Sequence, residues 1–160
     1  KGYSKFIENS VMSGLDGLTI PDLPVEENQE IFEIARKNDF KIVCFIAPTT
    51  TDQRVSLITQ KAQGFLYYIS VVGITGIRDK LPDDIIQNIN KLKQMTNIPV
   101  AVGFGVSTSE HAKLIGTVAD GVIVGSAIMR EIEKYAKEPS EELVRGVGEF
   151  VGQLISGAKG

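Results

Sequence analysis

Residues 99–107 read Pro-Val-Ala-Val-Gly-Phe-Gly-Val-Ser, an uncharged apolar run that ends in a glycine-rich turn. An apolar run this short, bounded by proline and glycine, is typical of a strand that is covered on both faces. The turn leads directly into an amphipathic segment, where Ser107 to Ser109 followed by Glu110 resemble a helix capping box. A buried strand, a glycine turn and a helix form the repeating unit of a parallel α/β sheet.

The same unit recurs along the whole chain. Strands are expected at 17–20, 41–46, 65–70, 99–102 and 121–124. Helices are expected at 26–38, 52–63, 83–95, 108–117, 126–136 and 140–155, with a further helix before Gly14. Thr51 and Asp52 supply a start signal for the helix at 52–63. No linker or internal repeat interrupts the pattern, so we predict one domain over residues 1–160.

Five strand–helix units are fewer than the eight of a closed (β/α)₈ barrel, which needs roughly 250 residues. The chain is therefore either an open sheet of the flavodoxin-like kind or part of a barrel. In the flavodoxin-like fold the phosphate loop follows the first strand, whereas the glycine-rich turns here follow the last three strands. This placement favours an α/β chain that forms only about the last five β/α units of a (β/α)₈ TIM barrel.

The composition is that of an ordinary globular protein, with 42% hydrophobic residues and a net charge of −3 from 17 basic and 20 acidic side chains. Mild acidity without a basic run argues against nucleic acid as the main partner. One cysteine and one histidine allow no intramolecular disulfide and too few ligands for zinc, so no metal site is expected. Neither a membrane-spanning apolar run nor a signal-peptide layout is present, so we expect a cytoplasmic protein.

Two turns at the ends of predicted strands have the features of an anion site. Residues 103–107 lead into one helix, and Gly125 with Ser126 begin another. The first amides of a helix lack partners within it, and the helix dipole favours negative charge there. Phosphate sites in (β/α)₈ barrels are often built from the loops after the last two strands. The pair of turns therefore predicts phosphate binding, and the alternative is that glycine is needed there for steric reasons alone.

A long turn and a proline-flanked turn are further candidates. Residues 71–81 exceed the usual length of a strand–helix loop, which predicts a lid with Thr75 at its polar tip; the alternative is a surface loop without this role. Pro21 and Pro24 flank Asp22 and would hold its carboxylate in a site, at a partner surface or as a helix cap. Asp22 is the one carboxylate at a predicted strand end, so no acid–base pair is found.

Of the remaining side chains, two aromatic ones point to ligand binding. Tyr67 and Phe104 stand near the ends of predicted strands, where a planar apolar ligand could lie between them; a place in the core is the alternative. His111 lies in an amphipathic helix beside Glu110 and is expected to be solvated rather than catalytic. Cys44 alternates with apolar neighbours in a strand and is expected to be buried and inert.

Five segments, in this order along the chain, match a pattern that we know. They are 14–24 (Gly-Leu-Asp-Gly-Leu-Thr-Ile-Pro-Asp-Leu-Pro), 45–50 (Phe-Ile-Ala-Pro-Thr-Thr), 67–76 with Tyr-Tyr-Ile-Ser and Gly-Ile-Thr-Gly, 102–106 (Val-Gly-Phe-Gly-Val) and 124–128 (Val-Gly-Ser-Ala-Ile). Together they resemble the family of tryptophan synthase α subunits. The Gly-Phe-Gly and Gly-Ser-Ala turns recur in several phosphate-binding barrels, but the Pro-Asp-Leu-Pro and Gly-Ile-Thr-Gly segments are specific.

The resemblance implies a (β/α)₈ barrel that cleaves indole-3-glycerol phosphate to indole and glyceraldehyde 3-phosphate in tryptophan biosynthesis, with no cofactor in this subunit. It also implies a pyridoxal-phosphate β subunit as partner in an α₂β₂ complex. The implied phosphate ligands are Gly76, Gly105, Gly125 and Ser126. The implied indole pocket is lined by Thr19, Pro21, Ile46, Tyr67 and Phe104. Thr75 and Tyr67 would support catalysis, and Asp22 and Pro24 would face the β subunit.

The chain departs from the family in one respect. The catalytic acid and base of the family, a glutamate and an aspartate, come from the early strands and would lie before Lys1. The chain alone is therefore predicted not to turn over substrate. Two alternatives stay open: another phosphate-binding barrel of amino-acid biosynthesis, or a non-catalytic half barrel that self-associates through its open sheet edges.

Overall fold

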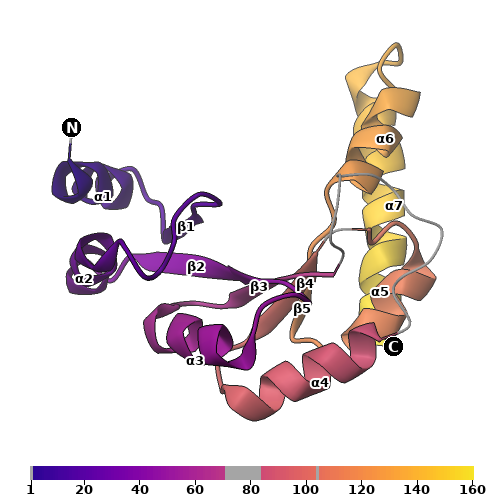
Figure 1. Cartoon of the computed structure of the whole chain (residues 1–160). Coiled ribbons are helices and arrows are strands. Elements are labelled where there is room, and N and C mark those ends of the chain that lie inside the picture. The colour runs from indigo at the N-terminus through magenta and orange to yellow at the C-terminus, as the bar shows by residue number, and fades with distance from the viewer. Residues whose placement is uncertain (1, 71–83, 104) are drawn as a thin grey trace.

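The computed structural model describes residues 2–70, 84–103 and 105–160. Strands and helices alternate along the chain (Figure 1). The strands are β1 (Gly17–Thr19), β2 (Lys41–Ile46), β3 (Leu66–Ile69), β4 (Val100–Gly103) and β5 (Gly121–Val122). The helices are α1 (Tyr3–Met12), α2 (Gln29–Lys37), α3 (Asp52–Lys61), α4 (Ile85–Met95), α5 (Ser109–Gly116), α6 (Ser126–Lys134) and α7 (Ser140–Lys159). The order and type of the predicted elements are confirmed.

The strands form one five-stranded parallel sheet in the order β1-β2-β3-β4-β5. Each strand lies beside the strand that precedes it in the chain, as in a (β/α)₈ barrel, whereas the flavodoxin-like order is 2-1-3-4-5. The sequential order therefore excludes the doubly wound alternative. In Figure 1, α1 and α2 lie at the β1 end of the sheet, and α5, α6 and α7 group at the other end.

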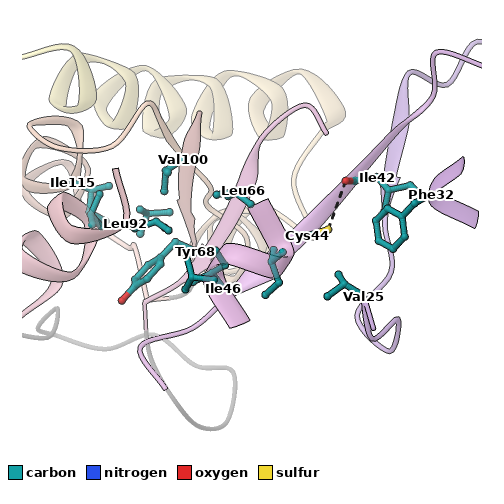
Figure 2. Close-up of a cluster of buried hydrophobic side chains, with 14 of the residues drawn as sticks. Val25, Phe32, Ile42, Cys44, Ile46, Leu66, Tyr68, Leu92, Val100 and Ile115 are labelled. Atoms are coloured by element: carbon teal, nitrogen blue, oxygen red, sulfur yellow. Dashed lines mark hydrogen bonds between the residues drawn. The ribbon is translucent and has the colours of Figure 1, made fainter. Parts of the chain in front are cut away.

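The core lies between the sheet and the helices. Alternate strand residues enter one buried cluster together with helix residues such as Phe32 of α2, Leu92 of α4 and Ile115 of α5 (Figure 2). The strand residues in this cluster are Ile42, Cys44, Ile46, Leu66, Tyr68, Val100 and Val102. Since successive side chains of a strand point to opposite faces, the residues between them face the other way. We call that side of the sheet the inner face; it carries Val43, Phe45, Tyr67, Ile69, Ala101, Gly103 and Gly121.

The start of α2 differs from the prediction. The helix begins at Gln29 rather than at residue 26. The backbone amide of Glu27 and the side-chain amide of Asn28 both donate to the carbonyl oxygen of Pro24, at 3.3 and 3.1 Å. These bonds close a turn over residues 24–28 immediately ahead of the helix. At the other end of the chain, α7 runs to Lys159, beyond the predicted end at 155.

Threonine hydroxyls cap two of the helices. The Thr51 hydroxyl accepts a hydrogen bond from the backbone amide of Arg54 at 3.4 Å and caps α3 as predicted. At α5 the Thr108 hydroxyl accepts from the backbone amide of His111 at 3.2 Å. The predicted capping box is therefore wrong by one residue, because Glu110 occupies the second helical position rather than the third. Hydrogen bonds from its own backbone amide and from the Thr108 hydroxyl lower the pKa of Glu110.

Glycines let α7 pack closely against α5. A Cβ atom on Gly116 of α5 would collide with the carbonyl oxygen of Ala158, and one on Gly157 of α7 would collide with the carbonyl oxygen of Ser109. The two helix backbones are therefore in direct contact at both positions. With 20 residues α7 is the longest helix, yet neither it nor another helix in the described ranges is long and apolar enough to cross a membrane.

Candidate functional site

The two predicted phosphate turns lie at the same edge of the sheet. They follow the carboxyl ends of β4 and β5, which are neighbouring parallel strands. Gly105 has a φ of 83°, a left-handed conformation that residues with a side chain rarely adopt. Gly125 is exposed, and a Cβ atom there would have open space around it. The structure therefore brings Gly105 and Gly125 to one edge, each ahead of the amino end of a helix.

The amino ends of these two helices differ. At α5 the Thr108 hydroxyl already accepts from one of the first amides, and Glu110 adds a negative charge to the first turn. At α6 the N-cap residue is Gly125, the first turn has no acidic residue, and no side chain of the described residues makes a capping hydrogen bond. Ser126, the first residue of α6, is exposed. The amino end of α6 is therefore better suited to bind an anion than that of α5.

The inner face carries an aromatic pair beside this edge. Tyr67 of β3 is in register with Phe45 of β2, and their ring centroids lie 5.0 Å apart with the planes tilted by 44°. On the other side of β3, the Tyr67 hydroxyl fills the space that a Cβ atom on Gly103 would need. Partial burial raises the pKa of Tyr67 above its ordinary value. Tyr67 therefore lies between an aromatic neighbour and a glycine, on the face that the core does not use.

Ile46 lies on the opposite face of the sheet. It is in register with Tyr68, is 2% exposed and belongs to the core (Figure 2). Burial, with a smaller contribution from the Asp84 carboxylate, raises the pKa of Tyr68 to about 12. The structure therefore does not bring Ile46 to the side of Tyr67, and Phe45 takes that place. Sequence reasoning missed Phe45 because β2 is apolar on both faces. Only the pairing register with β3 shows which face of β2 carries Phe45.

Thr19 and Pro21 are exposed at the carboxyl end of β1. β1 pairs with β2 only as far as Thr19 opposite Val43, and beyond that point the chain leaves β2. A cavity of about 380 Å³ lies between the departing loop and β2. Pro21 and Phe45 are among its lining residues, whereas Thr19 is not. The structure thus places Pro21 and Thr19 at the same strand end, and only Pro21 lines this cavity.

Asp22 and Pro24 lie in this departing loop, line the same cavity and are exposed. Two cationic side chains of α3 hold the segment that follows. The Lys61 ammonium group donates to the carbonyl oxygen of Val25 at 2.5 Å. Arg54 forms an ion pair with Glu26 at 3.3 Å. These contacts fix the loop on its helix side and leave the two predicted interface residues accessible.

Three predicted site residues, Thr75, Gly76 and Phe104, lie outside the described residues. The lid, one of the phosphate ligands and the second aromatic wall therefore stay predictions. Within residues 2–70, 84–103 and 105–160, no group of three or more His, Cys, Asp or Glu side chains is arranged to hold a metal ion.

Cys44 and His111, which the sequence analysis did not assign to a site, lie away from Gly105, Gly125 and Tyr67. Cys44 is 6% exposed, as predicted, and burial raises its thiol pKa to about 11 despite the nearby Lys61 charge. His111 sits in the first turn of α5, with its Nδ1 atom 3.4 Å from the Ser107 hydroxyl. A buried polar residue that sequence reasoning missed is Ser70, whose hydroxyl donates to the Gly103 carbonyl oxygen at 3.0 Å. Ser70 thereby ties the carboxyl ends of β3 and β4 together.

Five sequential parallel β/α units, with helix amino ends gathered at the carboxyl edge of the strands, define the chain as part of a (β/α)₈ barrel. A family model described as "Tryptophan synthase alpha chain" matches residues 1–158. The chain belongs to this family, as the sequence motifs predicted.

Individual relatives agree with the family. The chain is 42% identical over 154 residues to a tryptophan synthase alpha chain from a Thermoanaerobacter species, which covers 96% of this chain and 57% of the relative. A crystal structure of the alpha chain from Legionella pneumophila superposes with a TM-score of 0.83 at 31% identity, covering 99% of this chain and 57% of that one. A structure from work on the tryptophan synthase α₂β₂ complex of Pyrococcus furiosus superposes with a TM-score of 0.80 at 38% identity, covering 94% of this chain and 61% of that one. The chain thus spans about half the length of the curated relatives it matches.

Proposed function

We propose that this chain supplies the phosphate-binding and aromatic side of a site that cleaves indole-3-glycerol phosphate to indole and glyceraldehyde 3-phosphate. The observation that carries the proposal is the amino end of α6, which has neither a side-chain cap among the described residues nor an acid in its first turn. Family membership supports the choice of substrate. The phosphate group would accept hydrogen bonds from the amides after Gly125 and from the Ser126 hydroxyl. Gly105, at the neighbouring turn, and Gly76 are the further proposed ligands.

The aromatic ring of the substrate would lie along the inner face of the sheet. Tyr67 offers its ring there, on the same side of the sheet as Gly103. Thr19 and Pro21 stand at the carboxyl end of β1, and Phe104 is proposed as the second aromatic wall. A substrate held by its phosphate at one end and by its ring at the other has few orientations left, which is what positions it for reaction.

The proposed reaction is a carbon–carbon cleavage by general acid–base catalysis. A proton added to C3 of the indole ring weakens the bond to the side chain, and a base removes the proton of the adjacent hydroxyl. The electron pair of the carbon–carbon bond then returns to the indole ring, which leaves as indole. The former alcohol becomes the aldehyde of glyceraldehyde 3-phosphate. The acid and the base are proposed to lie before Lys1, so residues 1–160 alone are expected to bind and orient rather than to turn over substrate. The lid around Thr75 is proposed to exclude water.

The proposed partner is a tryptophan synthase β subunit. A crystal structure similar to this chain is that of the tryptophan synthase complex from Pyrococcus furiosus. Asp22 and Pro24 are exposed on a loop that α3 holds from its other side, and we propose this loop as the contact surface. Replacing Asp22 with Lys should then weaken capture of the β subunit, while the matched change of Asp39 to Lys, at a surface turn before β2, should not.

The proposed function is tested with residues 1–160 and a separately produced N-terminal fragment of a relative's alpha chain. Indole release that requires both pieces, and that falls when Ser126 is changed to Ala, supports the proposal. Folded association of the two pieces without indole release would contradict it. Tighter binding of aminosugar phosphates than of indole-propanol phosphate would instead favour another phosphate-binding barrel of amino-acid biosynthesis.

A second candidate function has its own observation. Apolar side chains of α1 are exposed, with Phe6 at 49% and Met12 at 86%, and Leu15 follows at 53%. These exposed apolar side chains at the β1 end of the sheet favour a half barrel that self-associates, since large exposed apolar surface marks an interaction site. Light scattering of the 17.4 kDa chain distinguishes the two: a mass of a dimer together with no binding of phosphate ligands supports the second candidate.

A further inference from the structure

We propose that Phe45 is a positioning residue for Tyr67, and that it thereby sets how tightly the site holds the aromatic part of its substrate. The inference rests on the proposed function, in which the Tyr67 ring contacts the indole ring. It adds a residue that the sequence motifs did not assign to the site.

The first observation is the direct contact between the two rings. Phe45 and Tyr67 are in register on neighbouring strands, and their ring centroids are 5.0 Å apart at an angle of 44°. Aromatic pairs attract one another in offset or tilted arrangements at this separation. The Phe45 ring therefore supports the Tyr67 ring from the β2 side and favours one orientation of it.

The second observation is the shape of the inner face on the other side of Tyr67. Ala101 of β4 is in register with Tyr67 and with Gly121 of β5. A Cβ atom on Gly121 would lie 3.4 Å from the Ala101 Cβ atom, so these two residues present a shallow surface. Large side chains thus stand on β2 and β3, and small ones on β4 and β5. The proposed place of the indole ring is this shallow surface next to Tyr67.

The third observation concerns the cavity that Phe45 lines. The space of about 380 Å³ between the loop after β1 and β2 reaches Phe45. A smaller side chain at position 45 would remove the ring that packs against Tyr67 and leave open space in its place. The Tyr67 ring could then turn toward β2, because packing no longer holds it, and its contact with a bound indole ring would be lost. The phosphate end of the ligand is proposed to bind at the amino end of α6, so its binding should not respond to this change.

The test compares two ligands on the chain as it occurs, with any segments that precede or follow residues 1–160. Indole-propanol phosphate carries both recognition groups, and glycerol 3-phosphate carries only the phosphate end. Dissociation constants are measured by calorimetry for Phe45→Leu, for Phe45→Tyr and for the control Phe40→Leu. Phe40 is 0% exposed and lies just before β2, roughly 17 Å from Phe45 along the strand, so its change affects the core without reaching Tyr67.

Phe45→Leu should raise the dissociation constant of indole-propanol phosphate roughly three- to tenfold, the range that corresponds to the loss of one aromatic pair. It should leave glycerol 3-phosphate unchanged, and Phe45→Tyr, which keeps the ring, should bind both ligands like the unmodified protein. Equal weakening of both ligands, or the same effect from Phe40→Leu, would show a merely structural role and overturn the inference. If the unmodified protein binds glycerol 3-phosphate but does not prefer indole-propanol phosphate, the proposed function itself fails, which is a distinguishable result.

Discussion

The hydroxyl group of Tyr67 occupies the space that a Cβ atom on Gly103 would need. Gly103 ends β4 and Tyr67 stands on the neighbouring strand β3, so the contact joins two strands at the edge where the glycine turns gather. The Gly103 carbonyl oxygen also accepts hydrogen bonds from the backbone amide and the hydroxyl of Ser70, at 3.1 and 3.0 Å. Gly103 is therefore held by Ser70 at its carbonyl group, and a side chain at position 103 would have to displace the Tyr67 ring.

Gly103→Ala should lower the free energy of unfolding by about 1–3 kcal/mol, the usual cost of forcing an extra group into a packed site. Urea denaturation measures this. In a Tyr67→Leu background, where the hydroxyl and ring are absent, the same change should cost less than about 0.5 kcal/mol. An equal cost in both backgrounds would mean that the Tyr67 contact is not its cause.

Ser126→Asp should change stability and phosphate binding in opposite directions. A carboxylate in the first turn interacts favourably with the amino end of α6 and should add about 0.3–1 kcal/mol to the free energy of unfolding. The same carboxylate would repel a phosphate group at that end, so binding of glycerol 3-phosphate should be lost. The matched control is Ser140→Asp at the first position of α7, which should stabilise without affecting the ligand. Retained phosphate binding in Ser126→Asp would count against this site.

Gly157→Ala and Gly152→Ala, both in α7, should change the free energy of unfolding in opposite directions. Alanine favours a helix over glycine by about 1 kcal/mol, and Gly152 has open space around its Cβ position, so Gly152→Ala should stabilise. At Gly157 the added atom would meet the carbonyl oxygen of Ser109, which belongs to the backbone of α5. The net effect there should be a loss of about 1–3 kcal/mol, seen as a lower thermal midpoint. A stabilising Gly157→Ala would show that α5 and α7 can move apart freely.

Asp120 should contribute to the acid sensitivity of the fold. A hydrogen bond from the Lys93 ammonium group at 2.7 Å and one from the Val100 backbone amide at 2.8 Å lower the pKa of the Asp120 carboxyl from 3.8. Because the folded pKa is lower than the unfolded one, its stabilisation is fully present above pH 3.8 and is lost as the pH falls through the folded value.

Denaturation curves across that range should therefore show a shallower acid limb for Asp120→Asn than for the unmodified chain. Lys93→Gln should produce a partial version of the same change, because the bond to the Val100 amide remains. An unchanged acid limb in Asp120→Asn would contradict the assignment.

Most of the fold could be predicted because its signals are local. The period of the apolar residues, the glycine turns and the threonine cap at Thr51 placed the helices and strands in the right order. The errors lie at element ends, where long-range or turn contacts decide. A turn closed on the Pro24 carbonyl by Glu27 and Asn28 occupies the residues before α2, and Thr108 rather than its neighbour caps α5.

The candidate site could be predicted less completely. Gly105, Gly125 and Ser126 were found because glycine ahead of a helix is visible in sequence, and the structure gathers these turns at one edge. Ile46 was predicted to line the indole pocket from the family resemblance, and the structure places it on the opposite face of β2 from Phe45, the residue that contacts Tyr67. Both residues are apolar and adjacent in β2, so composition and alternation offered no way to choose between them.

The sequence by itself determined the class of fold, the family and the order of the β/α units, because the spacing of apolar residues and the turn motifs depend on near neighbours in the chain. Only the tertiary structure decided which face of each strand meets the helices, and with it the contacts of Tyr67 with Phe45 and Gly103. The physical reason is that a strand covered on both faces has no polar side to mark its orientation. Its register against neighbouring strands, and the close fit that this allows, supply the missing information.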